Sequence, residues 1–213
     1  MNRILLSFLA GFAGLAAWAA APATARADAA VCLDALDDLG VRYERVSRKG
    51  IRTGVEVKSD LGGVEYRGYD KAPLVLDCSL VYSLAVSGRF LAAAGIVSVT
   101  YSSSYQRRNI RGTNRPSKHS YGLAIDVHTL HTEDETFSVT DDYEQGLGDN
   151  VDCIGEPLTK TGAVLRRINC QLVRSELFRI VLTPDYDAGH YNHFHIEALP
   201  WDERADVALP SVR

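Results

Sequence analysis

The run His190–His195 constrains the fold more than any other part of this chain, because it holds three of the six histidines. Successive side chains of a β-strand point to opposite faces of the sheet. We therefore expect His193 and His195 on one face, with Phe194 and Ile196 in the core. This alternation predicts a sheet with one apolar face and one face that carries histidines.

A second cluster lies upstream, in residues 117–128. Its alternation predicts a strand over residues 122–129 with one apolar face. Gly122 and Ala124 lie on the opposite face together with Asp126. Two small residues beside an acid predict open space above the sheet, which suits a metal or a substrate better than a packed core.

His119, Asp126 and His195 match the ligand set of a catalytic zinc ion. Zinc binds neutral imidazole nitrogens and carboxylate oxygens, and a catalytic site combines three protein ligands with a fourth position for water. A single carboxylate leaves the metal net positive, able to lower the pKa of bound water towards ~7. We interpret His128 as a solvent-facing strand residue, with a supporting role beside the ligands as the alternative, and His131 as a loop residue.

The rest of the pattern predicts one α+β domain, with a mostly antiparallel sheet that carries the zinc site and helices packed on one side. Strands and helices occur together without repeated βαβ units. Apolar spacing predicts helices over residues 30–39, 77–94 and 159–175. Alternation and β-branched residues predict further strands over residues 41–46, 55–58, 96–101, 177–182 and 193–198, and a polar loop over 109–118.

Residues 1–27 have the composition of a signal peptide. A positive start at Arg3 precedes an apolar run over residues 4–21, and a small-residue cleavage site follows at residues 25–27. We expect residues 28–213 to be the mature domain, exported to the periplasm or cell envelope, with no stable membrane insertion after cleavage. An uncleaved anchor is the alternative, because the apolar run approaches spanning length.

Charge disfavours nucleic acid as a partner. The full chain has a net charge of −4. Cleavage would remove Arg3 and Arg26 and make the charge more negative. A short arginine-rich stretch at residues 107–111 is the only local exception, and it is too short to indicate nucleic-acid binding.

The four cysteines are expected to form disulfides, because their number is even and the expected compartment is oxidising. Three pairings are possible. We favour Cys32–Cys78 and Cys153–Cys170, because each joins segments expected to pack together. No C-x-x-C motif occurs, which argues against a structural zinc knuckle or a thioredoxin-type site.

The two histidine clusters resemble the signature of a superfamily of zinc peptidases that includes lysostaphin-type enzymes, D-Ala-D-Ala peptidases and the hedgehog signalling domain. The signature S-x-H-x-x-G-x-A-x-D, followed downstream by H-x-H, is matched by Ser117, His119, Gly122, Ala124, Asp126, His193 and His195. Within this group the chain is most similar to bacterial extensin-like C-terminal domain proteins, over roughly residues 77–199.

The resemblance implies that His119, Asp126 and His195 bind Zn²⁺ and that His193 helps to stabilise the transition state. It implies a zinc metallopeptidase, a peptidoglycan DD- or LD-type endopeptidase or carboxypeptidase. Zinc-bound water would attack stem peptides or their cross-links. Arg107, or the arginine that follows it, is expected to hold a substrate carboxylate or carbonyl oxygen, with ordinary loop charge as the alternative.

His190 is the expected general base, since the spacing His190-x-x-His193-x-His195 resembles the murein endopeptidase branch. An imidazole with an ordinary pKa of ~6.5 can accept a proton near neutral pH. In a regular strand His190 would face away from His193, so the prediction requires a bend near Tyr191. The alternative is that His190 only packs at the edge of the cleft.

Two other functions stay open. A non-catalytic, zinc-containing domain that binds wall peptides is favoured by Asn192, because D-Ala-D-Ala-type members have a carboxylate there as general base. A serine or cysteine hydrolase is disfavoured, because Gly-x-Ser-x-Gly is absent and the cysteines are expected to be paired.

Overall fold

The computed structural model describes residues 23–148 and 152–204. Most of the expected signal peptide lies outside these residues. No helix of the described residues is long and apolar enough to cross a membrane. The helices are α1 (Ala23–Asp38), α2 (Cys78–Ala93), the short α3 (Val139–Asp142) and α4 (Lys160–Arg174), with 3-10 turns η1 (Lys118–Tyr121) and η2 (Trp201–Glu203).

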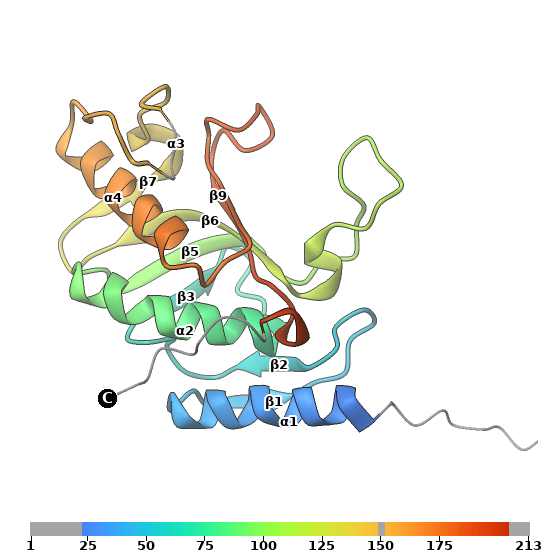
Figure 1. Cartoon of the computed structure of the whole chain (residues 1–213). Helices are drawn as coiled ribbons and strands as arrows, with labels where there is room; N and C mark the ends of the chain where they lie inside the picture. The colour runs from blue at the N-terminus through green and yellow to red at the C-terminus, as the bar shows by residue number, and fades with distance from the viewer. Residues whose placement is uncertain (1–22, 149–151, 205–213) are drawn as a thin grey trace, which may run out of the picture.

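The described strands form two sheets (Figure 1). The smaller sheet has the order β1-β2-β4 and is antiparallel; its strands are Tyr43–Arg45, Gly54–Val57 and Val75–Asp77. The larger has the order β3-β5-β6-β9-β8, with β7 paired to β6, and among its described pairs only β3 with β5 is parallel. Its strands are β3 (Glu65–Gly68), β5 (Ser98–Ser103), β6 (Ala124–His131), β9 (Phe194–Glu197), β8 (Ile180–Leu182) and β7 (Thr136–Ser138).

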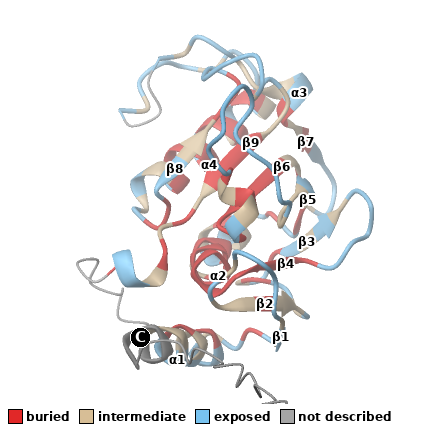
Figure 2. Ribbon diagram, turned by 90° about the vertical axis from the view of Figure 1, so that its right-hand side faces the viewer, coloured by how far each residue is buried: buried red, intermediate tan, exposed pale blue. Residues whose placement is uncertain are grey.

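Helices α2 and α4 cover one face of the larger sheet, and α2 separates it from the smaller sheet and α1 (Figures 1 and 2). Alternation along the strands directs apolar side chains to that face. The packed side chains, all buried, include Leu80, Leu84, Ile125, Val127, Leu165, Ile168, Phe194 and Ile196. The opposite face of β6 and β9 is therefore left for Asp126 and the histidines. This arrangement confirms the predicted α+β domain with a mostly antiparallel sheet.

Both favoured disulfides are present, Cys32–Cys78 and Cys153–Cys170, and no described cysteine is free. The first joins α1 to the start of α2. The second joins the segment before α4 to α4 itself. The structure thus confirms both favoured pairings.

All the expected helices and strands are present with shifted ends, but the sequence interpretation missed β3, β4, β7 and α3. These elements are three or four residues long. The interpretation of His131 as a loop residue was wrong. It ends β6, and its ring contacts the hydroxyl groups of Thr100, Thr129 and Thr136.

Candidate metal centre

Three elements bring His119, Asp126 and His195 together on the helix-free face of the larger sheet. Asp126 on β6 lies directly opposite His195 on β9 in the antiparallel register. His119 comes from η1, which immediately precedes β6. All three residues are buried. Antiparallel pairing thus places two ligand candidates, far apart in the sequence, next to each other.

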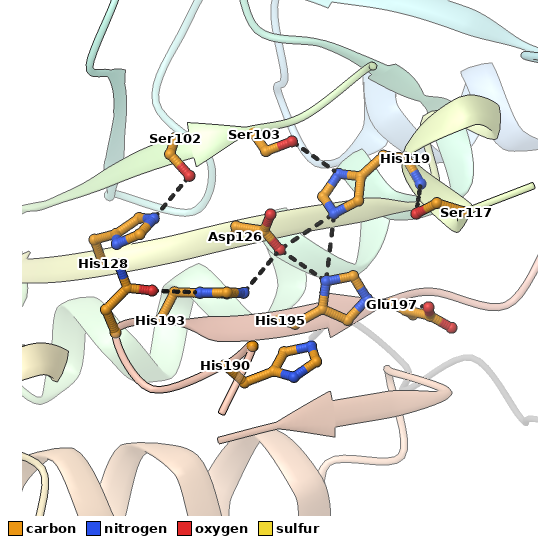
Figure 3. A network of polar contacts seen from close by, with 12 residues as sticks. Ser102, Ser103, Ser117, His119, Asp126, His128, His190, His193, His195 and Glu197 are labelled. Carbon is orange, nitrogen blue, oxygen red and sulfur yellow. Dashed lines mark hydrogen bonds and ion pairs between the residues drawn. The ribbon is translucent and has the colours of Figure 1, made fainter. Parts of the chain in front are cut away.

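Their inward atoms converge on one point (Figure 3). Oδ1 of Asp126 lies 2.7 Å from Nδ1 of His195 and 3.2 Å from Nε2 of His119. The two imidazole nitrogens are 3.3 Å apart. These three atoms form a cluster compact enough to share a metal ion.

The outward nitrogens of both rings determine which tautomer each ring adopts. Nδ1 of His119 donates to the backbone oxygen of Ser104 (2.8 Å), and Nε2 of His195 donates to Oε1 of Glu197 (3.0 Å). In the neutral rings, lone pairs then remain on the two inward nitrogens. Two lone pairs and a carboxylate oxygen at this spacing repel one another unless a proton or a cation lies among them. The donor set therefore fits zinc.

Burial and the contacts among these residues also shift the pKa values of the cluster. Burial alone would raise the pKa of Asp126, but its contacts with the rings of His119 and His195 outweigh burial and hold it far below its usual range. Burial alone would lower the pKa of His195, yet its bonds to Asp126 and Glu197 raise it to about 9. Without metal, one proton on His195 compensates the carboxylates, and a metal must displace that proton.

Two further histidines lie beside this cluster. His193 Nε2 is 3.5 Å from Asp126 Oδ1, and its Nδ1 donates to Oδ1 of Asn192 (2.9 Å). Burial lowers the pKa of His193 to about 4, so its ring is neutral at pH 7. His190 lies in a turn before β9, with ring centroids 5.2 Å from His193 and 5.6 Å from His195. The bend expected near Tyr191 is therefore present.

The turn also gives His190 an acidic partner, Asp187. Nδ1 of His190 contacts Oδ1 of Asp187 at 2.7 Å. The hydrogen bond from His190 lowers the pKa of Asp187. Asp187 therefore stays ionised and holds the proton on Nδ1, which leaves Nε2 as the proton-accepting atom of a neutral His190.

Arg108, rather than Arg107, reaches the centre. The guanidinium Nη2 of Arg108 lies 3.2 Å from Oδ2 of Asp126, while Arg107 is exposed and has no ion pair with a described residue. The substrate-binding role expected of Arg107 stays a prediction. His128 is half-buried, is hydrogen-bonded to Ser102 (2.7 Å) and stacks beside His193, so it supports the edge of the site.

Gly122 does not help to create open space above the sheet, as the sequence analysis expected. It caps η1 in the left-handed conformation (φ 66°), outside β6. A Cβ there would lie 2.7 Å from the backbone nitrogen of Asp77. The residue before η1, Ser117, accepts a hydrogen bond from the backbone of His119. Both residues hold the turn that positions His119, so the expectation for Gly122 was wrong.

Glu197 and Asp187 are the site residues that sequence reasoning missed. For Glu197 a signal exists: it lies two positions after His195 and thus on the same strand face. For Asp187 no periodic signal exists, because a turn connects it to His190.

The fold and this cluster define a class: an α+β domain with a buried His-Asp-His centre on an antiparallel sheet. The family model for the extensin-like protein C-terminus matches residues 30–205, and the chain belongs to that family. No curated protein and no solved structure matches the chain.

Proposed function

We propose that this protein is an exported zinc-dependent peptidase that cleaves stem peptides or cross-links of peptidoglycan. The observation that carries the proposal is the convergence of His119 Nε2, Asp126 Oδ1 and His195 Nδ1, with further histidines beside them. The peptide substrate and export come from the sequence resemblance and from residues 1–27.

His119, Asp126 and His195 would hold the zinc. When bound, zinc supplies a Lewis acid that activates water and polarises a peptide carbonyl. Burial of all three ligand residues keeps competing water away and fixes their rotamers.

The chain's own proton acceptor is His190, with Asp187 holding its Nδ1 proton. Its Nε2 would take a proton from the attacking water and deliver it to the leaving amine. His193 would stabilise developing negative charge on the carbonyl oxygen. In the structure Nδ1 of His193 donates to Asn192 Oδ1, so Nε2 of the neutral ring carries a lone pair. Donation from Nε2 would therefore require the Asn192 amide to turn and present its NH₂ group to Nδ1, which a carboxylate at that position could not do.

Arg108 would position the substrate. Its guanidinium is about half exposed and already lies beside Asp126, so it can hold a second anionic group at the open side of the centre. Arg107 remains the alternative anchor on the same loop.

The second candidate function is a zinc-containing domain that binds wall peptides without cleaving them. Asn192 favours it, because its side chain is bonded to His193 and an amide cannot act as a base. A cysteine hydrolase is not favoured, because all four cysteines are in disulfides.

Digestion of purified muropeptides distinguishes these candidates. The zinc-loaded protein should release new amines, and a chelator or Asp126→Asn should abolish the release. His131→Ala is the matched control, since that histidine lies on the same strand but outside the cluster. Zinc binding with muropeptide affinity but no new amines would support the binding domain instead.

A further inference from the structure

Two loops rich in arginine lie side by side next to the metal centre. The first, residues 45–52, connects β1 to β2; the second, residues 104–118, connects β5 to η1. Neither contains an acidic residue, although the whole chain carries a net charge of −4. They hold nine of the chain's 23 lysines and arginines: Arg45, Arg48, Lys49, Arg52, Arg107, Arg108, Arg111, Arg115 and Lys118. We call these two loops the basic surface.

Specific contacts join the two loops. The Tyr105 hydroxyl donates to the backbone oxygen of Lys49 (2.9 Å). At Gly50 (φ 96°), a Cβ would lie 2.5 Å from the backbone oxygen of Ser120, so glycine allows this close approach. Figure 1 shows both loops on the side of the molecule where η1 lies. The sequence separates these cations, and the fold brings them together.

The second loop is an ordered arm. Its base is fixed because the backbone nitrogen of Arg108 donates to Ser120 Oγ (2.9 Å) and Ser117 donates to the Arg108 carbonyl (2.9 Å). Farther out, Ile110 donates to the carbonyl of Arg115 (2.8 Å). The arm runs from Ser103, whose hydroxyl contacts His119, back to His119 itself. The base of this loop, with Arg108, is thus held beside the candidate metal centre.

Most of these cations have no acidic partner among the described residues. Arg52 pairs with Asp202, and Arg108 with Asp126. The other seven form no ion pair with any residue in ranges 23–148 and 152–204. The pocket beneath the loops has a volume of about 980 Å³ and is lined by basic and acidic side chains, the acidic ones including Asp77 and Glu203.

We propose that the basic surface binds the carboxylates of a polyanionic cell-wall strand and thereby presents that strand to the metal centre. Seven of the nine cations are arginines, whose planar guanidinium groups suit carboxylates. Unpaired like charges held close together repel one another, which an anionic partner would relieve. The acidic remainder of the chain repels a polyanion, so the molecule would approach with this side first. The choice of wall peptide as the source of carboxylates rests on the proposed function.

The test is cosedimentation of the zinc-loaded mature protein with purified sacculi at low and at physiological ionic strength. The test variant is Arg48→Gln/Arg111→Gln/Arg115→Gln, which leaves Arg107 and Arg108 intact. The matched control, Arg89→Gln/Lys160→Gln/Arg167→Gln, removes the same charge from exposed positions on α2 and α4. We expect the test variant to lose about tenfold in affinity at low salt, and the control to bind as the wild type does. Both should keep their zinc and thermal midpoint.

Carboxylate recognition is tested with sacculi whose carboxylates are blocked by coupling to a neutral amine. Blocked sacculi should lose wild-type binding. Equal binding of the two triple variants, or undiminished binding to blocked sacculi, would overturn the inference. So would tighter binding to phosphatidylglycerol vesicles or to DNA than to sacculi.

Cleavage of a small soluble muropeptide separates this inference from the proposed function. Carboxylate-dependent sacculus binding without cleavage would refute the peptidase and leave the basic surface standing. The opposite result is muropeptide cleavage by the wild type together with equal sacculus binding by the two triple variants. That result would refute the basic surface and leave the proposed peptidase activity standing.

Discussion

At the scale of single residues, the hydrogen-bond partners of the outer nitrogens of His119 and His195 determine which ring atoms face the candidate metal position. Ser104 and Glu197 hold the outer nitrogens of His119 and His195, so the inner nitrogens are the free ligand atoms. The two partners differ in kind. One is a backbone carbonyl that no substitution removes, and the other is a carboxylate whose charge can be changed.

Substitution of Glu197 should weaken zinc binding without unfolding the protein. Glu197→Gln keeps an oxygen to accept the His195 proton but removes the charge that raises ligand basicity. Loss of such a partner typically costs ~10–100-fold in metal affinity. We therefore expect Glu197→Ala to lose zinc affinity near the upper end of this range and Glu197→Gln near its lower end. Competition with a chromogenic chelator measures this. Glu133→Gln, an exposed loop control, should bind as the wild type does. Unchanged affinity in Glu197→Ala would contradict the role.

The pH dependence of stability should change sign when metal is added. The pKa of His195 is raised to about 9 in the metal-free fold, so its stabilisation is present below ~6.5 and lost as pH rises through about 9. The pKa of Asp126 is lowered, so its contribution is lost only in acid. Metal-free protein should therefore become less stable between pH 6.5 and 9. Zinc stabilisation should grow over the same range, because the ligands must lose protons. Both pH dependences can be checked by measuring urea unfolding midpoints across this range, once with a chelator and once with zinc. A midpoint that rises with pH in the presence of chelator would refute the predicted loss of stability in the metal-free protein.

At the scale of elements, the turn over residues 184–192 determines which side chains lie beside the candidate metal centre. A regular continuation of β9 would direct His190 away from His193. The turn instead places the three histidines of this segment around a common space, and Asp187 anchors the first of them. A regular strand would separate His190 from His193, and the turn brings them together.

His190→Ala should keep the fold and its zinc but lose cleavage by ~10²–10⁴-fold, the usual contribution of a general base. Asp187→Asn should lose less, because His190 keeps its ring and only its anchor is weakened. Muropeptide release rates alongside zinc content measure both variants. His128→Ala, which removes a supporting ring beside His193 but no expected base, provides the comparison. Full activity in zinc-loaded His190→Ala would remove His190 from the mechanism.

At the scale of the whole molecule, two disulfides tie helices to the fold from outside the site. Cys32–Cys78 closes a separation of 46 residues and Cys153–Cys170 one of 17. Neither involves a residue of the candidate metal centre. Their contribution should therefore appear in stability and leave the zinc affinity of the folded protein unchanged.

Removal of either bridge should cost about 2–4 kcal/mol of unfolding free energy in the chain-entropy description. The longer loop predicts that Cys32→Ala/Cys78→Ala costs about 1 kcal/mol more than Cys153→Ala/Cys170→Ala. Denaturant unfolding of the two double variants gives the difference directly, and wild-type zinc affinity serves as the control for an intact site. A larger loss from the shorter bridge would contradict the loop-length argument.

The sequence alone determined the α+β class and the main strands, because periodicity is a local property of the chain. It favoured the two disulfide pairs among three possibilities, and the structure confirmed them. It also singled out His119, Asp126 and His195. Tertiary structure decided which atoms of these residues meet, through the register of β6 and β9 and the hydrogen bonds of the outer nitrogens. It decided, too, that Asp187 reaches His190 and that two basic loops form one surface. Such contacts depend on turns and long-range packing, which leave no periodic trace in the sequence.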